Sequence, residues 1–331
     1  MAVLDVEDLS THYFIREGTV KAADDISFGI KEREAFGLAG ESGCGKTTVA
    51  LSIMKLLPPA GRIIKGEILL DEEDLVSKKE EEMGTVRWKK ISMVFQGAMN
   101  ALNPVINVGE QIAEAIITKE NISKGDAWSR VKNLFELVGL DPKRIKDYPH
   151  EFSGGMRQRV MIAMALACNP RLVIADEPVT ALDVIVQGKI IELLKELQKK
   201  FDLSVMLITH DLSVIAEVCN KVGIMYAGKL MECADATGLF KSPRHPYTQR
   251  LIGAYPSVVG EKRRLNFIPG VPPDLINPPS GCRFHPRCPY AKKECPETEP
   301  PYVEAEEGRL VACHFVDELK DVLKQATTHD K

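Results

Sequence analysis

Residues 40–47, with the sequence GESGCGKT, fit the P-loop pattern G-x-x-x-x-G-K-[ST]. Glycines let the backbone curl so that successive N–H groups point at one centre and bind an anion there. Lys46 can reach the β- and γ-phosphates of a nucleotide, and the Thr47 hydroxyl can ligate Mg²⁺. An apolar run at residues 35–39 predicts a strand before the loop, and residues 47–57 predict a helix after it. Strand, glycine turn and helix in this order predict a site for a nucleoside triphosphate.

Cys44 lies inside this loop. The positive end of the following helix and the ammonium of Lys46 are expected to favour its thiolate. We therefore expect alkylation of Cys44 to block nucleotide binding, and Mg-ATP to protect it.

A second pattern ends another apolar strand. Residues 172–175 (LVIA) are followed by Asp176 and Glu177. An acid at the tip of a buried strand beside a P-loop can hold Mg²⁺, usually through water. Glu177 is then placed to polarise the attacking water as a general base, a role worth about 10²–10⁴ in rate. Acids before a helix also favour its dipole, but the P-loop makes this second interpretation the weaker one.

Further short motifs, in the same order and spacing as in ATP-binding cassette (ABC) ATPases, extend to about residue 235. Gln96 resembles the Q-loop glutamine, and residues 153–155 (SGG) resemble the signature motif. Residues 181–183 resemble the D-loop, and His210 resembles the switch histidine. Tyr13 stands where the family places an aromatic ring that stacks on adenine, with a core residue as the weaker alternative.

The resemblance assigns roles to particular residues. Phe152 and Met156 depart from the Leu and Gln usual in the signature, while the Ser-Gly-Gly core is intact. The resemblance gives Glu177, His210 and Gln96 catalytic roles, and Mg²⁺ would be held by Thr47, Gln96 and Asp176. The residues expected to bind the nucleotide are Tyr13, Gly40, Ser42, Gly43, Cys44, Gly45, Lys46, Thr47, Thr48, Gln96, Ser153, Gly154, Gly155, Asp176 and Asp183.

Longer segments resemble the ATPases of bacterial dipeptide and oligopeptide importers. These segments are residues 96–104 (QGAMNALNP), 176–184 (DEPVTALDV), 245–251 (HPYTQRL) and 281–289 (GCRFHPRCP). Nickel importers and some oligosaccharide importers share the same machinery. The resemblance therefore implies an ATPase that drives import of dipeptides or oligopeptides, with nickel or oligosaccharides, or a soluble ABC ATPase not tied to transport, as alternatives.

The resemblance also implies partners. Two ATPase subunits close over two ATP molecules, and each ATP on one subunit's P-loop is completed by the other's signature motif. The second subunit would be a related but distinct ATPase, and the peptide would pass through two transmembrane permease subunits. An extracytoplasmic peptide-binding protein would act indirectly. The chain would thus lie on the cytoplasmic face of the cell membrane, held there by the permease.

Apolar strands that alternate with helices predict an α/β fold, and the resemblance implies a P-loop RecA-like core, an antiparallel β subdomain and a helical subdomain. We expect a nucleotide-binding domain over residues 1–235, with its core at 1–96 and 153–235 and the helical subdomain at 97–152. Within that subdomain, helices are expected near residues 108–119 and 127–138. Residues 236–331 form a Pro-rich, Cys-containing C-terminal extension, in which helix signals are sparse before Val316.

Four cysteines gather in this extension: Cys282, Cys288, Cys295 and Cys313. Structural zinc sites usually contain tight C-x₂₋₄-C pairs, which are absent here. Wider spacing fits Cys₄ ligation of a four-iron four-sulfur cluster, and the family resemblance points the same way. A zinc site, with His285 or His314 as additional ligands, and four free thiols remain the alternatives.

Composition limits the remaining classes. The net charge of −4 gives no electrostatic case for nucleic-acid binding. No apolar run approaches the length of a membrane span, and the N-terminus lacks the apolar region of a signal peptide, so a cytosolic protein is expected. Residues 220–223 (NKVG) do not supply the N-K-x-D base reader of a GTPase.

Overall fold

The structure is a computed structural model that describes residues 2–97, 101–254 and 268–328. Residues 98–100 of the 96–104 segment lie outside the described residues. The chain divides into two compact units. Unit 1 comprises residues 1–3, 30–34 and 77–208, and unit 2 comprises residues 4–29, 35–76 and 209–331.

Unit 2 contains most of an antiparallel sheet with the strand order β2-β1-β4-β5. Its strands are β1 (Ala2–Ile15), β2 (Gly18–Lys31), β4 (Gly61–Leu70) and β5 (Glu73–Asp74). In the β1–β4 pair, Leu4 lies opposite Leu70 and Val6 opposite Ile68. All four side chains are buried, so this pair packs one apolar face against the core.

A second set of strands in unit 2 has the order β11-β12-β10-β9-β3. The strands are β3 (Ala35–Ala39), β9 (Lys221–Tyr226), β10 (Lys229–Asp235), β11 (Tyr302–Glu306) and β12 (Arg309–Ala312). β3 is parallel to β9, whereas β10 is antiparallel to both β9 and β12. The C-terminal hairpin β11–β12 therefore adds two strands to the edge of the sheet that contains β3, the strand before the P-loop.

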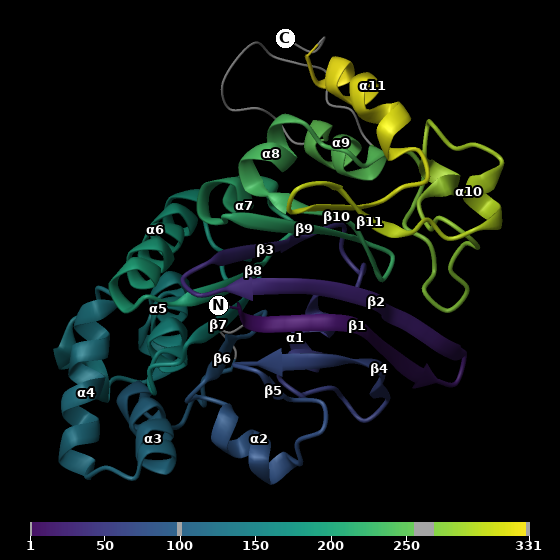
Figure 1. The fold of residues 1–331 in the computed structure, drawn as a ribbon. Helices are drawn as coiled ribbons and strands as arrows, with labels where there is room; N and C mark the ends of the chain where they lie inside the picture. Colours follow the sequence, from purple (N-terminus) through teal and green to yellow (C-terminus); the bar gives the residue numbers. More distant parts are fainter. Residues whose placement is uncertain (1, 98–100, 255–267, 329–331) are drawn as a thin grey trace. The chain divides into compact units, whose positions relative to one another are not determined.

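Helices of unit 2 come from both ends of the chain. They are α1 (Lys46–Ile53), α7 (Leu212–Val218), α8 (Ala236–Lys241), α9 (Pro246–Gly253), η4 (His285–Arg287), α10 (Glu294–Glu297) and α11 (Val316–Thr328). α9 and α11 lie side by side, although more than 60 residues separate them (Figure 1). Gln249 on α9 donates a hydrogen bond to the carbonyl of Leu323 on α11.

Unit 1 contains the parallel strands β6 (Ile91–Val94), β7 (Leu172–Asp176) and β8 (Ser204–Ile208), in that order. All their residues are buried, as expected for parallel strands covered on both faces. The helices are α2 (Glu80–Val86), α3 (Val108–Glu120), α4 (Lys124–Leu137), η2 (Pro142–Lys146), η3 (Pro149–Glu151), α5 (Gly154–Ala165) and α6 (Val184–Phe201).

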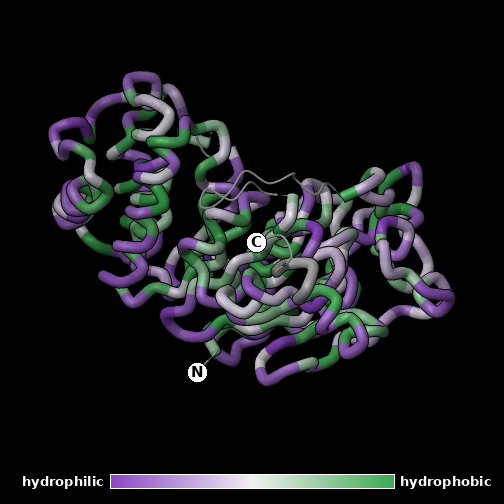
Figure 2. The backbone as a smooth tube through the Cα atoms, turned by 90° about the horizontal axis from the view of Figure 1, so that it is seen from above, coloured by the Kyte–Doolittle hydropathy of each residue, from purple (hydrophilic) through white to green (hydrophobic). Residues whose placement is uncertain are grey.

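The α3–α4 pair shows why this region is helical. Asn107 and Ser123 cap the two helices by accepting backbone N–H groups through their side chains. Green hydrophobic and purple hydrophilic stretches alternate along the backbone (Figure 2), and in α3 and α4 the side chains of Ile112, Ile116 and Val131 are fully buried. An amphipathic helix packs by its apolar stripe in this way.

The predicted α/β fold is confirmed, with differences in detail. The strand at residues 35–39 is observed as predicted, but α1 ends at Ile53 rather than near residue 57. Helices α8 and α9 occupy a segment in which the prolines had indicated few helices, because Pro246 stands at the first turn of α9, where proline is tolerated. Across the described parts of the chain, no helix is both long and apolar enough to span a bilayer.

Candidate functional site

The P-loop in unit 2 joins β3 to α1. Gly45 has φ 107°, and a Cβ atom at this position would lie 1.8 Å from the carbonyl oxygen of Ala22, so only glycine fits. The Nζ atom of Lys46 donates hydrogen bonds to the carbonyls of Gly40 at 2.8 Å and Glu41 at 3.0 Å. The ammonium is therefore held against the loop's own backbone, at the positive end of α1.

The first turn of α1 carries the other predicted nucleotide groups. Thr47 is partly exposed, and Ser42 and Gly43 are exposed at the outer edge of the loop. The Thr48 hydroxyl lies 3.2 Å from the phenol oxygen of Tyr13. Unit 2 thus brings Tyr13 next to the helix that follows the P-loop, whereas its stacking on adenine stays a prediction.

The Cys44 thiol does not have the lowered pKa that its position in the P-loop predicts. Its side chain is 4% exposed, and burial raises the pKa of the thiol even though Lys46 acts in the opposite direction. The Lys46 Nζ atom lies 3.7 Å from the sulfur, but the cost of placing a thiolate out of water is larger than this attraction. The prediction of a favoured thiolate at Cys44 is wrong.

The end of β7 carries the predicted acids. Asp176 is fully buried as the last residue of the strand. Glu177 follows with φ 46°, an uncommon backbone conformation for a residue with a side chain. Its Oε2 atom accepts hydrogen bonds from Nε2 of Gln96 and from the hydroxyl of Thr180, each at 2.9 Å. Unit 1 therefore brings the predicted Q-loop glutamine into direct contact with the predicted base.

The signature segment begins α5. The Ser153 hydroxyl caps this helix by accepting the N–H of Met156. A Cβ atom at Gly155 would lie 2.5 Å from Cγ1 of Val186 on α6. Glycine at this position therefore allows α5 and α6 to approach closely. Gly154 is the first residue of α5.

Both departures from the usual signature contact one arginine. The Arg144 guanidinium lies over the Phe152 ring, 4.4 Å from its centre, and donates to the Met156 sulfur at 3.6 Å. The Phe152 ring also packs edge-on against Phe135, with 6.5 Å between centroids. These contacts are a physical reason for an aromatic ring and a thioether at the two positions.

The remaining predicted groups stand at helix starts. The Asp183 carboxylate caps α6 by accepting the N–H of Val186 at 3.0 Å. In unit 2, Thr209 donates its N–H to the carbonyl of Leu38, at the end of β3. His210 follows and is exposed, so it stands at the same strand end from which the P-loop starts.

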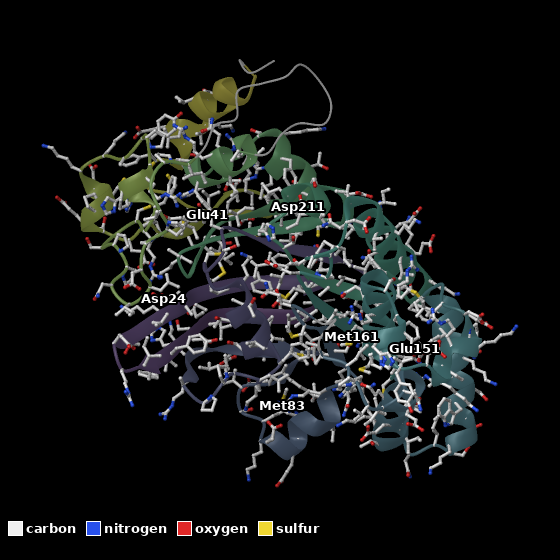
Figure 3. The ribbon with its side chains drawn as sticks, turned by 180° about the vertical axis from the view of Figure 1, so that it is seen from behind. Asp24, Glu41, Met83, Glu151, Met161 and Asp211 are labelled. Carbon is white, nitrogen blue, oxygen red and sulfur yellow. The ribbon has the colours of Figure 1, made fainter. Side chains whose placement is uncertain are left out.

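Sequence reasoning missed Arg287 and Tyr247, which hold the P-loop residue Glu41 in place. Glu41 accepts hydrogen bonds from both terminal nitrogens of Arg287, at 2.7 and 3.0 Å. Its own N–H donates to the phenol oxygen of Tyr247 at 3.1 Å. Figure 3 labels Glu41 near the green and yellow-green C-terminal segments from which these partners come. Their separation of more than 200 residues explains why no local pattern could indicate the contact.

The prediction of an iron–sulfur cluster at Cys282, Cys288, Cys295 and Cys313 is wrong, and so is the zinc alternative. In the part of the chain that the structure describes, no group of three or more His, Cys, Asp or Glu side chains is placed to hold a metal ion. The four cysteines are free and line a cavity of about 20 Å³, which has room for about one water molecule.

Burial also affects the protonation of these thiols. Burial raises the pKa of Cys282 to about 12 and that of Cys288 to about 11, and it also raises the pKa of Cys313. The wide spacing of the cysteines brings them near one another without arranging their sulfur atoms as a ligand set.

Two protein-family models match the chain. The "ABC transporter" model matches residues 23–180, and the "Oligopeptide/dipeptide transporter, C-terminal region" model matches residues 231–295. The first covers the P-loop, the signature and the end of β7, and the second covers three of the four clustered cysteines. With relatives at about 45% identity over nearly the whole chain, this protein belongs to the ATP-binding subunits of ABC transporters. ABC ATPases use ATP and typically Mg²⁺.

The most similar relatives include dipeptide and oligopeptide transport ATP-binding proteins. The chain is 45% identical over 319 residues to the dipeptide transport ATP-binding protein DppD of Bacillus subtilis, covering 96% of this chain and 95% of the relative. It is 47% identical over 313 residues to the oligopeptide transport ATP-binding protein OppD of the same organism, covering 93% and 87%. OppD of Escherichia coli is 45% identical over 314 residues, covering 94% and 93%.

Solved structures share the cassette fold. The ATP-binding cassette MJ0796, in a dimeric post-hydrolysis state bound to ADP and Pi, superposes with a TM-score of 0.64 at 28% identity, covering 70% of this chain and 98% of that one. The cassette cbiO1 of Clostridium perfringens gives a TM-score of 0.63 at 27% identity, covering 72% and 90%.

Proposed function

We propose that this chain is the ATPase that powers import of dipeptides or oligopeptides through partner membrane subunits. One observation carries the hydrolytic part: the Glu177 carboxylate is oriented by Gln96 and Thr180 at the end of β7, in a chain whose P-loop is intact. The names of the relatives support the peptide part, since those relatives match 93–96% of the chain.

In this proposal the P-loop binds the triphosphate of ATP. Backbone N–H groups of residues 40–48 and the ammonium of Lys46 bind the phosphates, and Tyr13 packs on the adenine. The proposed Mg²⁺ ligands are Thr47, Gln96 and Asp176, which offer the hard oxygen donors that Mg²⁺ prefers. Bound Mg²⁺ neutralises charge on the β- and γ-phosphates.

Glu177 is the proposed general base. Two hydrogen bonds to its Oε2 atom fix the direction of the carboxylate, so that a water molecule can pass a proton to it as the phosphate is attacked. His210 is proposed to contact the γ-phosphate. Ser153, Gly154, Gly155 and Asp183 are proposed to complete the ATP site of a second ATPase subunit.

The proposed assembly is the one that the family resemblance implies. Residues 1–235 form the nucleotide-binding domain and residues 236–331 the C-terminal extension, and residues 97–152 dock on two transmembrane permease subunits at the cytoplasmic face. The second ATPase is a related but distinct chain, and a peptide-binding protein on the other side of the membrane supplies the substrate.

Co-purification tests the assembly. A tagged chain isolated from gently solubilised membranes should carry permease subunits and a second ATPase, and peptide should stimulate its ATP hydrolysis. Nickel or an oligosaccharide as the only stimulating substrate would replace the peptide proposal. Full transport with this chain as the only ATPase present would refute the heterodimer.

Phosphate release tests the base. Glu177→Gln should abolish turnover, whereas the matched variant Glu192→Gln, at an exposed position on α6, should hydrolyse ATP at the parent rate. Equal loss in both variants, or in neither, would remove Glu177 from the proposed role.

A further inference from the structure

Glu41 places a carboxylate inside the P-loop, directly after Gly40. A P-loop binds a polyanion, and two negative charges at close range repel each other, most strongly away from bulk water. A carboxylate at this position therefore works against phosphate binding unless a cation compensates it. Arg287, from the C-terminal extension, is that cation.

The pairing has the geometry of a specific contact. Nη1 of Arg287 lies 2.7 Å from Oε2 of Glu41, and Nη2 lies 3.0 Å from Oε1. Two parallel hydrogen bonds of this kind fix the direction of the carboxylate as well as its distance. The Arg287 side chain is 6% exposed and that of Glu41 23% exposed, so water screens the pair only weakly.

Arg287 is itself held from other sides. Its Nε atom donates to the carbonyl of Pro269 at 2.7 Å, and its Nη1 atom lies 3.3 Å from the Tyr226 hydroxyl. The guanidinium also lies 5.6 Å from the centre of the Tyr226 ring. Hydrogen bonds at the edge of the guanidinium and the Tyr226 ring at its face together fix the orientation of this planar group. The C-terminal extension therefore presents a rigid cation to the P-loop.

A second contact fixes the backbone of the same residue. Tyr247, at the start of α9, accepts the Glu41 N–H through its phenol oxygen. The Tyr247 ring is fully buried and packs against Tyr226 and Phe284, with ring centroids 4.6 and 5.2 Å apart. Glu41 of the P-loop is thus contacted by Tyr247 from segment 245–251 and by Arg287 from segment 281–289.

We propose that Arg287 is a positioning residue of the nucleotide site: it holds Glu41 and compensates its charge, so that the P-loop is arranged for the triphosphate. The proposal rests on ATP binding at the P-loop. Its consequence is that the C-terminal extension contributes to ATP affinity without touching the nucleotide.

The test measures the Kd of Mg-ATP for the full chain by titration calorimetry. Arg287→Met keeps the length of the side chain and removes the charge, and we expect the Kd to rise about tenfold or more. Arg287→Lys keeps the charge but loses the fork, so its Kd should lie between those of the parent and Arg287→Met. Adding Glu41→Gln to Arg287→Met should restore most of the lost affinity, because the uncompensated carboxylate is gone.

Recovery of ATP affinity when Glu41→Gln is added to Arg287→Met distinguishes a positioning role of Arg287 from a purely structural one. If Arg287 only stabilised the extension, the double variant would bind ATP as poorly as the single one, and that result would overturn the proposal. In steady-state assays the loss should appear in KM, with kcat at saturating ATP changed less than about threefold. If Arg287→Met does not fold, the double variant and Arg287→Lys are compared with the parent under the same criteria.

Arg244→Met is the matched control. Arg244 is another buried arginine of the extension, 7% exposed and paired with Glu306, and among the described residues its hydrogen bonds go to Glu232 and Glu306. Its replacement should lower the unfolding midpoint while leaving the Kd of Mg-ATP unchanged. An Arg287→Met protein that binds ATP like the parent would overturn the positioning role alone. A parent chain that does not bind ATP, or that binds it equally after Lys46→Ala, would instead overturn the proposed function.

Discussion

We expect His245 to make the stability of unit 2 depend on pH. Its side chain is 1% exposed, and its Nδ1 atom accepts the N–H of Tyr247 at 3.0 Å, which caps α9. The backbone N–H of His245 donates to the carboxylate of Glu232, which is fully buried. Burial lowers the pKa of His245 to about 3, so the ring is neutral in the folded chain near neutral pH.

The direction of the effect follows from proton binding. An unfolded histidine has a pKa of about 6.5, so the unfolded chain binds more protons than the folded chain at any pH between about 3 and 6.5. The free energy of unfolding therefore falls as the pH is lowered through this window. With these two pKa values, lowering the pH from 8 to 5 costs about 2 kcal/mol from His245 alone.

Urea unfolding at pH 8 and pH 5 measures this cost. His245→Asn keeps a side-chain oxygen that can cap α9, but the asparagine side chain does not titrate. The loss of unfolding free energy between pH 8 and pH 5 should therefore be about 2 kcal/mol smaller in this variant than in the parent. His150→Asn, at an exposed position, controls for the loss of a histidine. The same pH dependence in the parent and in His245→Asn would refute the reasoning.

Three further perturbations test separate parts of the account. Glu177→Gln should lower ATP turnover by at least about 10²-fold while the Kd of Mg-ATP changes little; phosphate release near the parent rate would contradict the base assignment. Cys44 should react with iodoacetamide in the folded chain much more slowly than a free thiol, because burial raises the pKa of its thiol; mass spectrometry that finds equal rates would contradict its burial. Phe152→Leu should lower the free energy of unfolding by about 1 kcal/mol through loss of its contact with Arg144, and an unchanged urea midpoint would show that this contact contributes nothing.

Local pattern was enough to predict the P-loop and its flanking elements. The strand at residues 35–39, the glycine turn and the helix after Lys46 depend on neighbours in sequence, and they are observed. The contact of Gln96 with Glu177 joins residues that are 81 positions apart, and no spacing rule derives it. The family resemblance pointed to each of the two residues separately.

The C-terminal extension was the least predictable part. Its prolines indicated little regular structure, yet α8, α9 and the β11–β12 hairpin form there. The Arg287–Glu41 pair spans 246 positions, so it is set by tertiary packing alone. The spacing of the four cysteines indicated that they gather, but it did not specify the directions of their sulfur atoms, and the metal prediction failed on that geometry.

ATP-driven peptide uptake is the decisive measurement for the proposed function. The complex that co-purifies with this chain would be placed in vesicles loaded with Mg-ATP, with the peptide-binding protein and a radiolabelled dipeptide outside. We predict uptake that requires internal ATP and that stops when the chain carries Glu177→Gln, while Glu192→Gln leaves uptake intact. Vesicles that hydrolyse ATP but take up no peptide, or that take up peptide equally with Glu177→Gln, would contradict it.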